Sequence, residues 1–211
     1  MSTIQKNTIR QIIDSYYTGT IQAHGATPRG VDWKDDSSHA LRFKQLLSVI
    51  SEPDLPFSLN DYGCGYGALY DYLREHHYDV TYHGFDLSAA MIKQAEKHLT
   101  LSPQCAVSVG LEPEQQADYS VASGIFNVRQ HINDEEWLAH IYKVLENMSR
   151  FSNKAFAFNC LSEYSDADYR KDYLYYCNPC AIFDYCKQQI SPNVALLHDY
   201  GLYECTIIVR S

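Results

Sequence analysis

The sequence lacks any run rich in lysine and arginine. Its 211 residues include 17 Lys and Arg against 26 Asp and Glu, which gives a formal net charge of −9 at pH 7. Proteins that bind nucleic acid use a basic face to displace the counterions of the phosphates. We therefore expect no nucleic-acid partner.

Long apolar runs are absent as well. The N-terminal stretch MSTIQKNTIRQIIDSYY has no uninterrupted apolar core of the kind found in a signal peptide. No segment is long and apolar enough to span a bilayer. The seven cysteines are odd in number and scattered, which favours reduced thiols over a disulfide framework. Together these features predict a cytoplasmic protein with no membrane partner.

Repeats, low-complexity segments and Gly/Ser linkers are also missing, and the length suits one domain with a sizeable core. We expect residues 1–52 to be an N-terminal helical extension and residues 53–211 to be the core of the same domain. The sequence gives no indication of the oligomeric state.

From residue 57 onward, strand patterns alternate with helix patterns. The predicted strands are 57–62, 80–85, 106–109, 119–123 and 154–160. The predicted helices are 66–76, one that Ser88 caps, one that begins at Asp134, and 181–188. Such alternation is typical of a parallel sheet with helices on both faces.

Two further strands, 193–199 and 203–210, close the chain, with Tyr200, Gly201 and Leu202 between them. A parallel pair would need a long crossover, so this pair must be antiparallel. The predicted fold class is therefore α/β, a doubly wound, seven-stranded, mostly parallel sheet with an antiparallel C-terminal hairpin and N-terminal helices.

A glycine-rich stretch, LNDYGCGYGAL, ends the first predicted strand and begins the following helix. Ligands of a doubly wound sheet bind at the carboxyl ends of the strands, where the strand order reverses. Asp86 ends the second strand, roughly twenty residues further on, where a carboxylate can accept the hydroxyl protons of a ribose. The stretch also satisfies the dinucleotide fingerprint in its Gly/Ala variant, so the glycines alone do not decide which nucleoside cofactor binds.

This stretch, followed by YHGFDLSAAMIKQAEKH, resembles the first two motifs of class I S-adenosylmethionine-dependent methyltransferases. Members of that family have an acid two positions before the first glycine and often a cysteine between the glycines, as Asp61 and Cys64 are here. The stretch ADYSVASGIFN resembles the family's fourth motif, and the family's sheet also ends in an antiparallel hairpin. The resemblance implies that S-adenosylmethionine is the cofactor.

The resemblance also implies a set of cofactor-binding residues. Asp61 would lie near the methionine end, Gly63 and Gly65 would allow a close backbone approach, and Asp86 would hold the ribose. Arg42 precedes the glycines by about twenty residues, where several methyltransferases place an arginine that pairs with the cofactor's carboxylate as a bidentate match. The complete set is Arg42, Asp61, Gly63, Cys64, Gly65, Asp86, Leu87, Met91, Leu111, Ser123 and Gly124. Leu111 departs from the family, because many members have an acid there that binds the adenine amino group.

The acceptor of the methyl group is expected to be a small molecule. The acidic surface disfavours nucleic acid, and the Asn/Asp-Pro-Pro-Tyr/Phe/Trp motif of amino-directed DNA enzymes is missing. No catalytic residue is indicated, apart from His131 as a candidate general base. Two alternatives remain open: a nicotinamide-dependent oxidoreductase, and a non-enzymatic interaction module on the same fold.

Cys177, Cys180 and Cys186 form the remaining motif. A zinc site of the ribbon or finger type needs two closely spaced cysteine or histidine pairs, and only one pair is present. We expect no metal, and these cysteines to be reduced thiols.

Overall fold

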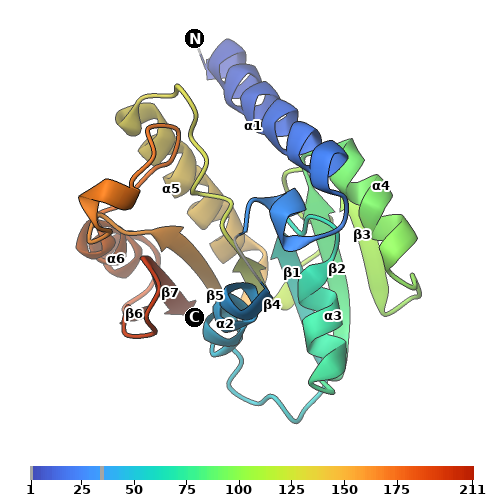
Figure 1. Ribbon diagram of the computed structural model, residues 1–211. Helices are drawn as coiled ribbons and strands as arrows, with labels where there is room; N and C mark the ends of the chain where they lie inside the picture. The colour runs from blue at the N-terminus through green and yellow to red at the C-terminus, as the bar shows by residue number, and fades with distance from the viewer. Residues whose placement is uncertain (1, 34–35) are drawn as a thin grey trace.

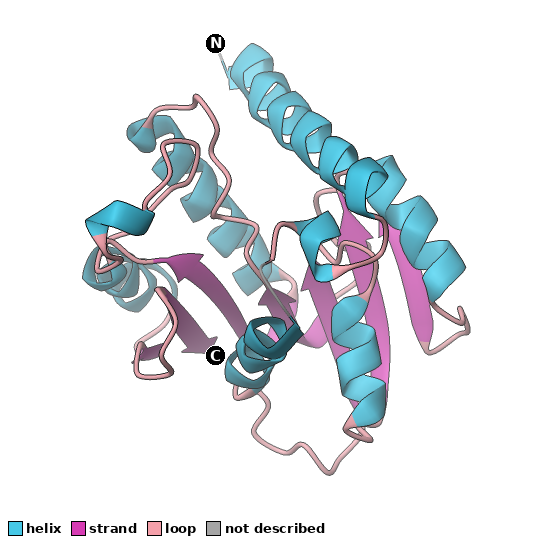
Figure 2. Ribbon diagram, viewed as in Figure 1, coloured by secondary structure: helices cyan, strands magenta, loops and turns pink. Residues whose placement is uncertain are grey.

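A computed structural model describes residues 2–33 and 36–211 of the chain. Its centre is a seven-stranded sheet in the order β3-β2-β1-β4-β5-β7-β6. Helices lie on both faces of this sheet (Figure 2). The strands are β1 Phe57–Tyr62, β2 Val80–Asp86, β3 Cys105–Val109, β4 Ala117–Ala122, β5 Ser152–Leu161, β6 Asn193–Leu197 and β7 Glu204–Arg210.

Six α-helices accompany the sheet in the described residues. They are α1 Ser2–His24, α2 Asp36–Leu47, α3 Ala68–Glu75, α4 Ala89–His98, α5 Asp134–Arg150 and α6 Pro179–Tyr185. A 3₁₀ turn, Pro28–Val31, joins α1 to α2, and a π-helical turn, Cys186–Ile190, continues α6. The helix α3 starts two residues later than predicted because Gly67, its N-cap, has φ of 93°, which a helix cannot include.

The C-terminal hairpin is antiparallel, as the sequence predicts. Strand β7 pairs antiparallel with β6 on one side and with β5 on the other, whereas β1 to β5 pair in parallel. The predicted fold class is therefore confirmed. The connection is longer than the predicted turn, since β6 ends at Leu197 and β7 begins at Glu204.

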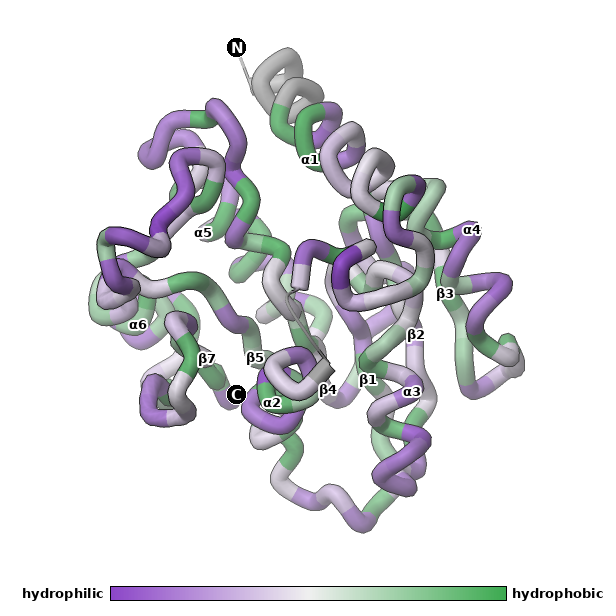
Figure 3. The backbone as a smooth tube through the Cα atoms, in the orientation of Figure 1, coloured by the Kyte–Doolittle hydropathy of each residue, from purple (hydrophilic) through white to green (hydrophobic). Residues whose placement is uncertain are grey.

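Each face of the sheet packs its own hydrophobic cluster. Phe43 and Leu46 of α2 and Leu73 of α3 pack on one face. On the other face, α5 buries Trp137, Ile141, Leu145 and Met148, which lie at helical spacing on one stripe. Figure 3 shows an apolar stretch, in green, in the strand β7. None of the described helices combines the length and hydropathy that a membrane crossing requires.

The strand order reverses at β1, which lies between β2 and β4. Ligands of such sheets bind at this point, beyond the carboxyl ends of the strands. The glycine stretch follows β1 there, and α1 crosses above it to contact α4 (Figure 1). The helix α1 therefore roofs the end of the sheet at which a cofactor is expected.

Candidate functional site

The glycine stretch turns sharply at the end of β1. The N–H groups of Gly63 and Cys64 both donate to the carbonyl of Phe85, at 2.9 and 3.1 Å, and this ties the turn to the neighbouring strand β2. Gly63 and Gly65 have φ of 70° and 57°, in the left-handed region that favours glycine. A Cβ at Gly63 would lie 2.3 Å from the side chain of Ile125, so this position has no room for a larger residue.

Asp86, the last residue of β2, faces this turn. Its Oδ2 accepts from the N–H of Gly65 at 3.1 Å, and its Oδ1 accepts from the N–H of Ser88 at 2.8 Å. Burial raises the pKa of Asp86 to about 6, although these backbone donors counteract the rise. The carboxylate is thus held by backbone donors, and its remaining lone pairs are available to a ligand.

Asp61 on β1 is a second buried carboxylate at the same edge, with 2% of its surface exposed. The hydroxyl of Tyr82 donates to its Oδ2 at 2.7 Å. Burial raises the pKa of Asp61 to about 7, and the charge of Asp86 adds to the rise. Two neighbouring carboxylates that repel each other, Asp61 buried and Asp86 half-buried, favour a ligand that carries positive charge.

A cavity of about 110 Å³ opens between these groups. It brings together almost all the residues that the resemblance to methyltransferases implies for the cofactor. The residues of that set that line it are Asp61, Gly63, Cys64, Gly65, Asp86, Leu87, Met91, Leu111, Ser123 and Gly124. Apart from Arg42, the cofactor-binding residues that the resemblance implies therefore line the same cavity.

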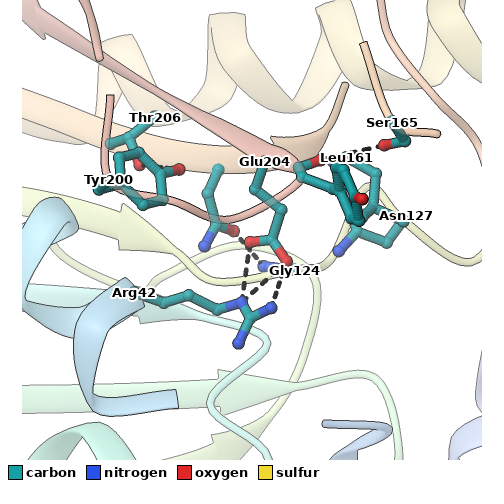
Figure 4. A network of polar contacts seen from close by, with 10 residues as sticks. Arg42, Gly124, Asn127, Leu161, Ser165, Tyr200, Glu204 and Thr206 are labelled. Carbon is teal, nitrogen blue, oxygen red and sulfur yellow. Dashed lines mark hydrogen bonds and ion pairs between the residues drawn. The ribbon is translucent and has the colours of Figure 1, made fainter. Parts of the chain in front are cut away.

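Arg42 belongs to the predicted set but does not line this cavity. Its Nε donates to both carboxylate oxygens of Glu204 at 2.8 Å, and its Nη2 donates to Oε1 at 2.5 Å (Figure 4). The guanidinium stacks on the ring of Trp33, 3.9 Å from its centroid. Arg42 is thus held by a protein carboxylate, which the sequence did not indicate.

Three buried polar atoms near this pair have no hydrogen-bond partner in the described part of the chain: Arg42 Nη1, Ser123 Oγ and Asn159 Nδ2. Asn159 lies beside the turn that carries Ser123, because its Oδ1 accepts from the N–H of Gly124 at 2.6 Å. Trp33 links the group, since it stacks on Arg42 and would collide with a Cβ at Gly124. Buried donors without a partner are costly, so their gathering here fits an anionic ligand group such as a carboxylate.

Ring side chains from the N-terminal part of the chain line the cavity. Tyr17 and Trp33 line it, as does His39 on α2. Burial and the nearby charge of Arg42 lower the pKa of His39 to about 4, so its ring is neutral at pH 7. His39 is not among the residues predicted from the sequence, although it lies four residues before Phe43 on the apolar stripe of α2.

A second cavity, of about 440 Å³, lies between α1 and α5. It continues the first one, because Ile13, Leu87, Leu111, His140 and Val144 line both cavities. Its wall is largely apolar, and its polar groups are Arg10, Glu112, His131, Asn133, Glu136, His140, Lys143 and Asn147.

Two histidines differ in their relation to these cavities. His131, the predicted candidate base, is exposed; it lines the second cavity but not the first. His140 lies at the junction, where burial and the charge of Lys143 lower its pKa to about 4. His140 is likewise not among the predicted residues, although it lies three residues after Trp137 and four before Val144 on α5.

The motif Cys177-x-x-Cys180 with Cys186 does not come together. Cys180 is exposed on α6, whereas Cys177 and Cys186 are buried. The described residues contain no close group of these three sulfurs.

Comparison with known sequences identifies a family for this arrangement. Residues 61–151 match a family described as a methyltransferase domain. The chain is also 50% identical over 164 residues to a protein of Mycobacterium tuberculosis (strain ATCC 25618 / H37Rv) named "Putative methyltransferase Rv1506c". That match covers 78% of this chain and 98% of the relative.

Solved structures share the fold at low sequence identity. One is the magnesium protoporphyrin IX methyltransferase of Synechocystis PCC 6803 with bound SAH, with a TM-score of 0.68, 12% identity, and coverage of 97% of this chain and 99% of that chain. Another is the human N-acetylserotonin methyltransferase in complex with SAM, with a TM-score of 0.58, 14% identity, and coverage of 81% of this chain and 51% of that chain. At such identities the likeness concerns the fold alone.

Proposed function

Because the chain belongs to the methyltransferase family, we propose that it transfers the methyl group of S-adenosylmethionine to a small-molecule acceptor. The position of Asp86 carries this proposal. Its carboxylate ends β2 at the switch point of the sheet, faces the glycine turn, and lines the same cavity as Asp61 and Ser123. This arrangement suits a ligand with a ribose at one end and a charged amino acid at the other.

The residues present fit the two ends of this cofactor. Asp86 would accept hydrogen bonds from the ribose hydroxyls, and Leu87, Met91 and Leu111 would contact the adenine. Asp61 would attract the amino group. Ser123 Oγ, which has no partner and belongs to a residue that lines the cavity, would receive the carboxylate. Arg42 is not among the residues that line the cavity, and Nη1 is the one of its three nitrogens that would make the predicted contact, since Glu204 occupies the other two.

The second cavity is the proposed acceptor site. It joins the cofactor cavity at His140 and Val144, and its volume and largely apolar wall suit a small organic molecule. The relatives of similar fold whose names state a substrate, a porphyrin and N-acetylserotonin, act on molecules of this kind. The net charge of −9 disfavours a nucleic-acid acceptor.

The protein's contribution to catalysis is positioning and exclusion of water. When bound, the sulfonium supplies an electrophilic methyl carbon for in-line displacement. The roof of α1 and the aromatic ring of Trp33 would keep this region dry and the acceptor aligned. His140, with a lowered pKa, is a weak base, so it suits a hydrogen bond to the acceptor more than removal of its proton. His131 remains the candidate base where an acceptor must lose a proton.

Calorimetric titration tests the cofactor against the two alternatives. We expect S-adenosylhomocysteine to bind and to raise the melting temperature by mass action, and Asp86→Ala to lose most of that rise. Binding of NADH alone would establish an oxidoreductase. For a non-enzymatic module, the melting temperature in excess S-adenosylhomocysteine would be the same in the wild type and in Asp86→Ala.

The acceptor needs its own experiment. The protein is incubated with S-adenosylmethionine and panels of phenols, carboxylic acids, amines and thiols of small size, and products are read by mass spectrometry. A product heavier by one methylene unit, accompanied by S-adenosylhomocysteine, identifies the acceptor class. Ile12 lines the second cavity, so Ile12→Ala would enlarge it and is expected to extend the range of accepted molecules.

A further inference from the structure

Three cysteines that are far apart in the sequence meet in the core behind the hairpin. Cys160 lies on β5, Cys205 lies on β7, and Cys177 precedes α6. Their sulfur atoms are 3.1 Å (Cys160–Cys177), 3.7 Å (Cys160–Cys205) and 3.9 Å (Cys177–Cys205) apart. All three residues are fully buried.

Backbone pairing fixes this arrangement. Cys160 and Cys205 are directly opposed in the antiparallel register of β5 and β7, so their side chains leave the sheet on the same face. Cys177 is held beside them, because its N–H donates to the carbonyl of Leu161 at 2.8 Å and its carbonyl accepts from Glu163 at 2.9 Å. The three sulfurs therefore face a common point without any change of backbone.

The triangle has the size of a metal site. A point in its plane lies roughly 2.1 Å from all three sulfurs, slightly inside the ~2.3 Å of a metal–thiolate bond. An outward shift of about 0.2 Å by each sulfur would make room for an ion at that bond length. The other buried cysteine of this cluster, Cys186, is not part of the group.

The ligand set indicates which ion fits. Thiolates select soft ions such as Cu(I) and Zn(II). Structural zinc takes four ligands, and within the described residues no histidine, carboxylate or fourth cysteine joins the three sulfurs. We propose that Cys160, Cys177 and Cys205 form a three-sulfur binding site for Cu(I).

Such an ion would fasten the segment between β5 and α6 to the sheet. Cys177 is the one ligand on that irregular segment, and two residues earlier the N–H of Tyr175 donates to the carbonyl of Asn127 at 2.7 Å. Asn127 follows the turn that carries Ser123 and Gly124. Local opening of the segment would admit the ion, and bound ion would oppose that opening.

Titration of the reduced full-length protein with Cu(I), in competition with a Cu(I) chelator, tests the site. We expect one ion per chain, a higher melting temperature with Cu(I) than without it, and three sulfur neighbours in X-ray absorption of the wild type. Cys205→Ala and Cys160→Ala should each lower the affinity at least 100-fold. Cys186→Ala, which removes a buried thiol of the same cluster, and Cys180→Ala, which removes the exposed one, should retain it.

Other results would overturn the proposal. These are failure of the reduced wild type to take Cu(I) from the chelator, loss of binding in Cys180→Ala, or fewer than three sulfurs around the ion. The wild-type stoichiometry and absorption spectrum decide the question even where an alanine variant fails to fold. Readouts of cofactor binding are not involved, so this result is independent of the methyltransferase proposal.

Discussion

Arg42 and Glu204 form a buried ion pair between residues 162 positions apart in the sequence. The pair joins α2 to the first residue of β7, and the exposed fraction of the side chain is 10% for Arg42 and 1% for Glu204. Two hydrogen bonds from one nitrogen and one from another give a fork geometry that lysine could not provide. The pair therefore couples the N-terminal helices to the far end of the sheet.

Substitution Glu204→Ala is predicted to destabilise the protein strongly. It would leave the guanidinium buried without its carboxylate, which costs about 3–5 kcal/mol. For a chain of this length, that loss corresponds to a fall of roughly 6–20 °C in melting temperature. Thermal unfolding measures it.

The matched control removes a glutamate from an exposed pair. Glu112 and Arg150 are 3.1 Å apart, and more than half of each side chain is exposed. Glu112→Ala should change stability by less than about 1 kcal/mol. Equal losses in the two variants would show that the buried pair has no special role.

Cofactor affinity is predicted to fall at acidic pH. The pKa of Asp86 is raised to about 6 by burial, so below that value the carboxylate becomes protonated and accepts fewer hydrogen bonds from a ribose. The dissociation constant of S-adenosylhomocysteine should rise by up to tenfold per pH unit below about 6. At pH 8, Asp86→Asn should weaken binding about 100-fold relative to the wild type. At pH 5 the difference between the two dissociation constants should be smaller.

The stability of the ligand-free protein should follow the opposite trend. The folded pKa of Asp86 exceeds that of an unfolded aspartate, so between about pH 4 and 6 the folded state holds a proton that the unfolded chain has released. This group's contribution to stability is thus present at low pH and is lost as pH rises through about 6. For the binding experiment, a dissociation constant of S-adenosylhomocysteine that does not change with pH in either the wild type or Asp86→Asn would refute the assignment of Asp86 to the ribose.

Tyr82→Phe is predicted to destabilise the protein in a pH-dependent way. At pH 8 the carboxylate of Asp61, whose pKa is about 7, is mostly ionised and loses the donor at 2.7 Å, at a cost of about 2 kcal/mol. At pH 5 Asp61 is protonated and depends less on that donor, so the loss should be smaller. Urea unfolding at the two pH values measures the difference.

Tyr119→Phe is the control for this experiment. Its hydroxyl is 3.1 Å from the neutral hydroxyl of Ser51, so the cost of removal should not change between pH 5 and pH 8. The same pH dependence in both variants would mean that Asp61 does not titrate as described.

The sequence predicts the strands that carry this site better than it predicts the side-chain contacts around it. β1 and β2 are predicted because apolar and polar residues alternate at their starts, and because glycine and aspartate mark their ends. Their ends bring Asp61, Asp86 and the glycines together without further information. Partners from distant segments leave no local pattern, which is why the Arg42–Glu204 pair was not foreseen.

The cysteine group and the second cavity could not be predicted from the sequence for the same reason. The three sulfurs that meet behind the hairpin come from different elements, and their meeting depends on the register of β5 and β7. The only local spacing visible in the sequence, Cys177-x-x-Cys180, pointed to a pair that the fold separates. The second cavity depends on how α1 lies relative to α5, which helical periodicity does not determine.

Substitutions of His140 and His131 are expected to change different kinetic constants. His140 lines both cavities and has a pKa lowered to about 4, so it is neutral throughout the physiological range. His140→Ala should therefore raise the KM for the acceptor by roughly tenfold, the value of one hydrogen bond, with less effect on kcat.

His131→Ala tests the opposite pattern. If the acceptor loses a proton to this imidazole, kcat should fall by about 10²–10⁴-fold while KM changes little. Both variants are assayed with the acceptor that the product screen identifies, and S-adenosylhomocysteine titration checks that each still binds the cofactor. A kcat effect at His140 together with none at His131 would assign the proton transfer to the junction of the cavities. An acceptor that needs no deprotonation would leave kcat unchanged at both positions, because alignment alone then determines the rate.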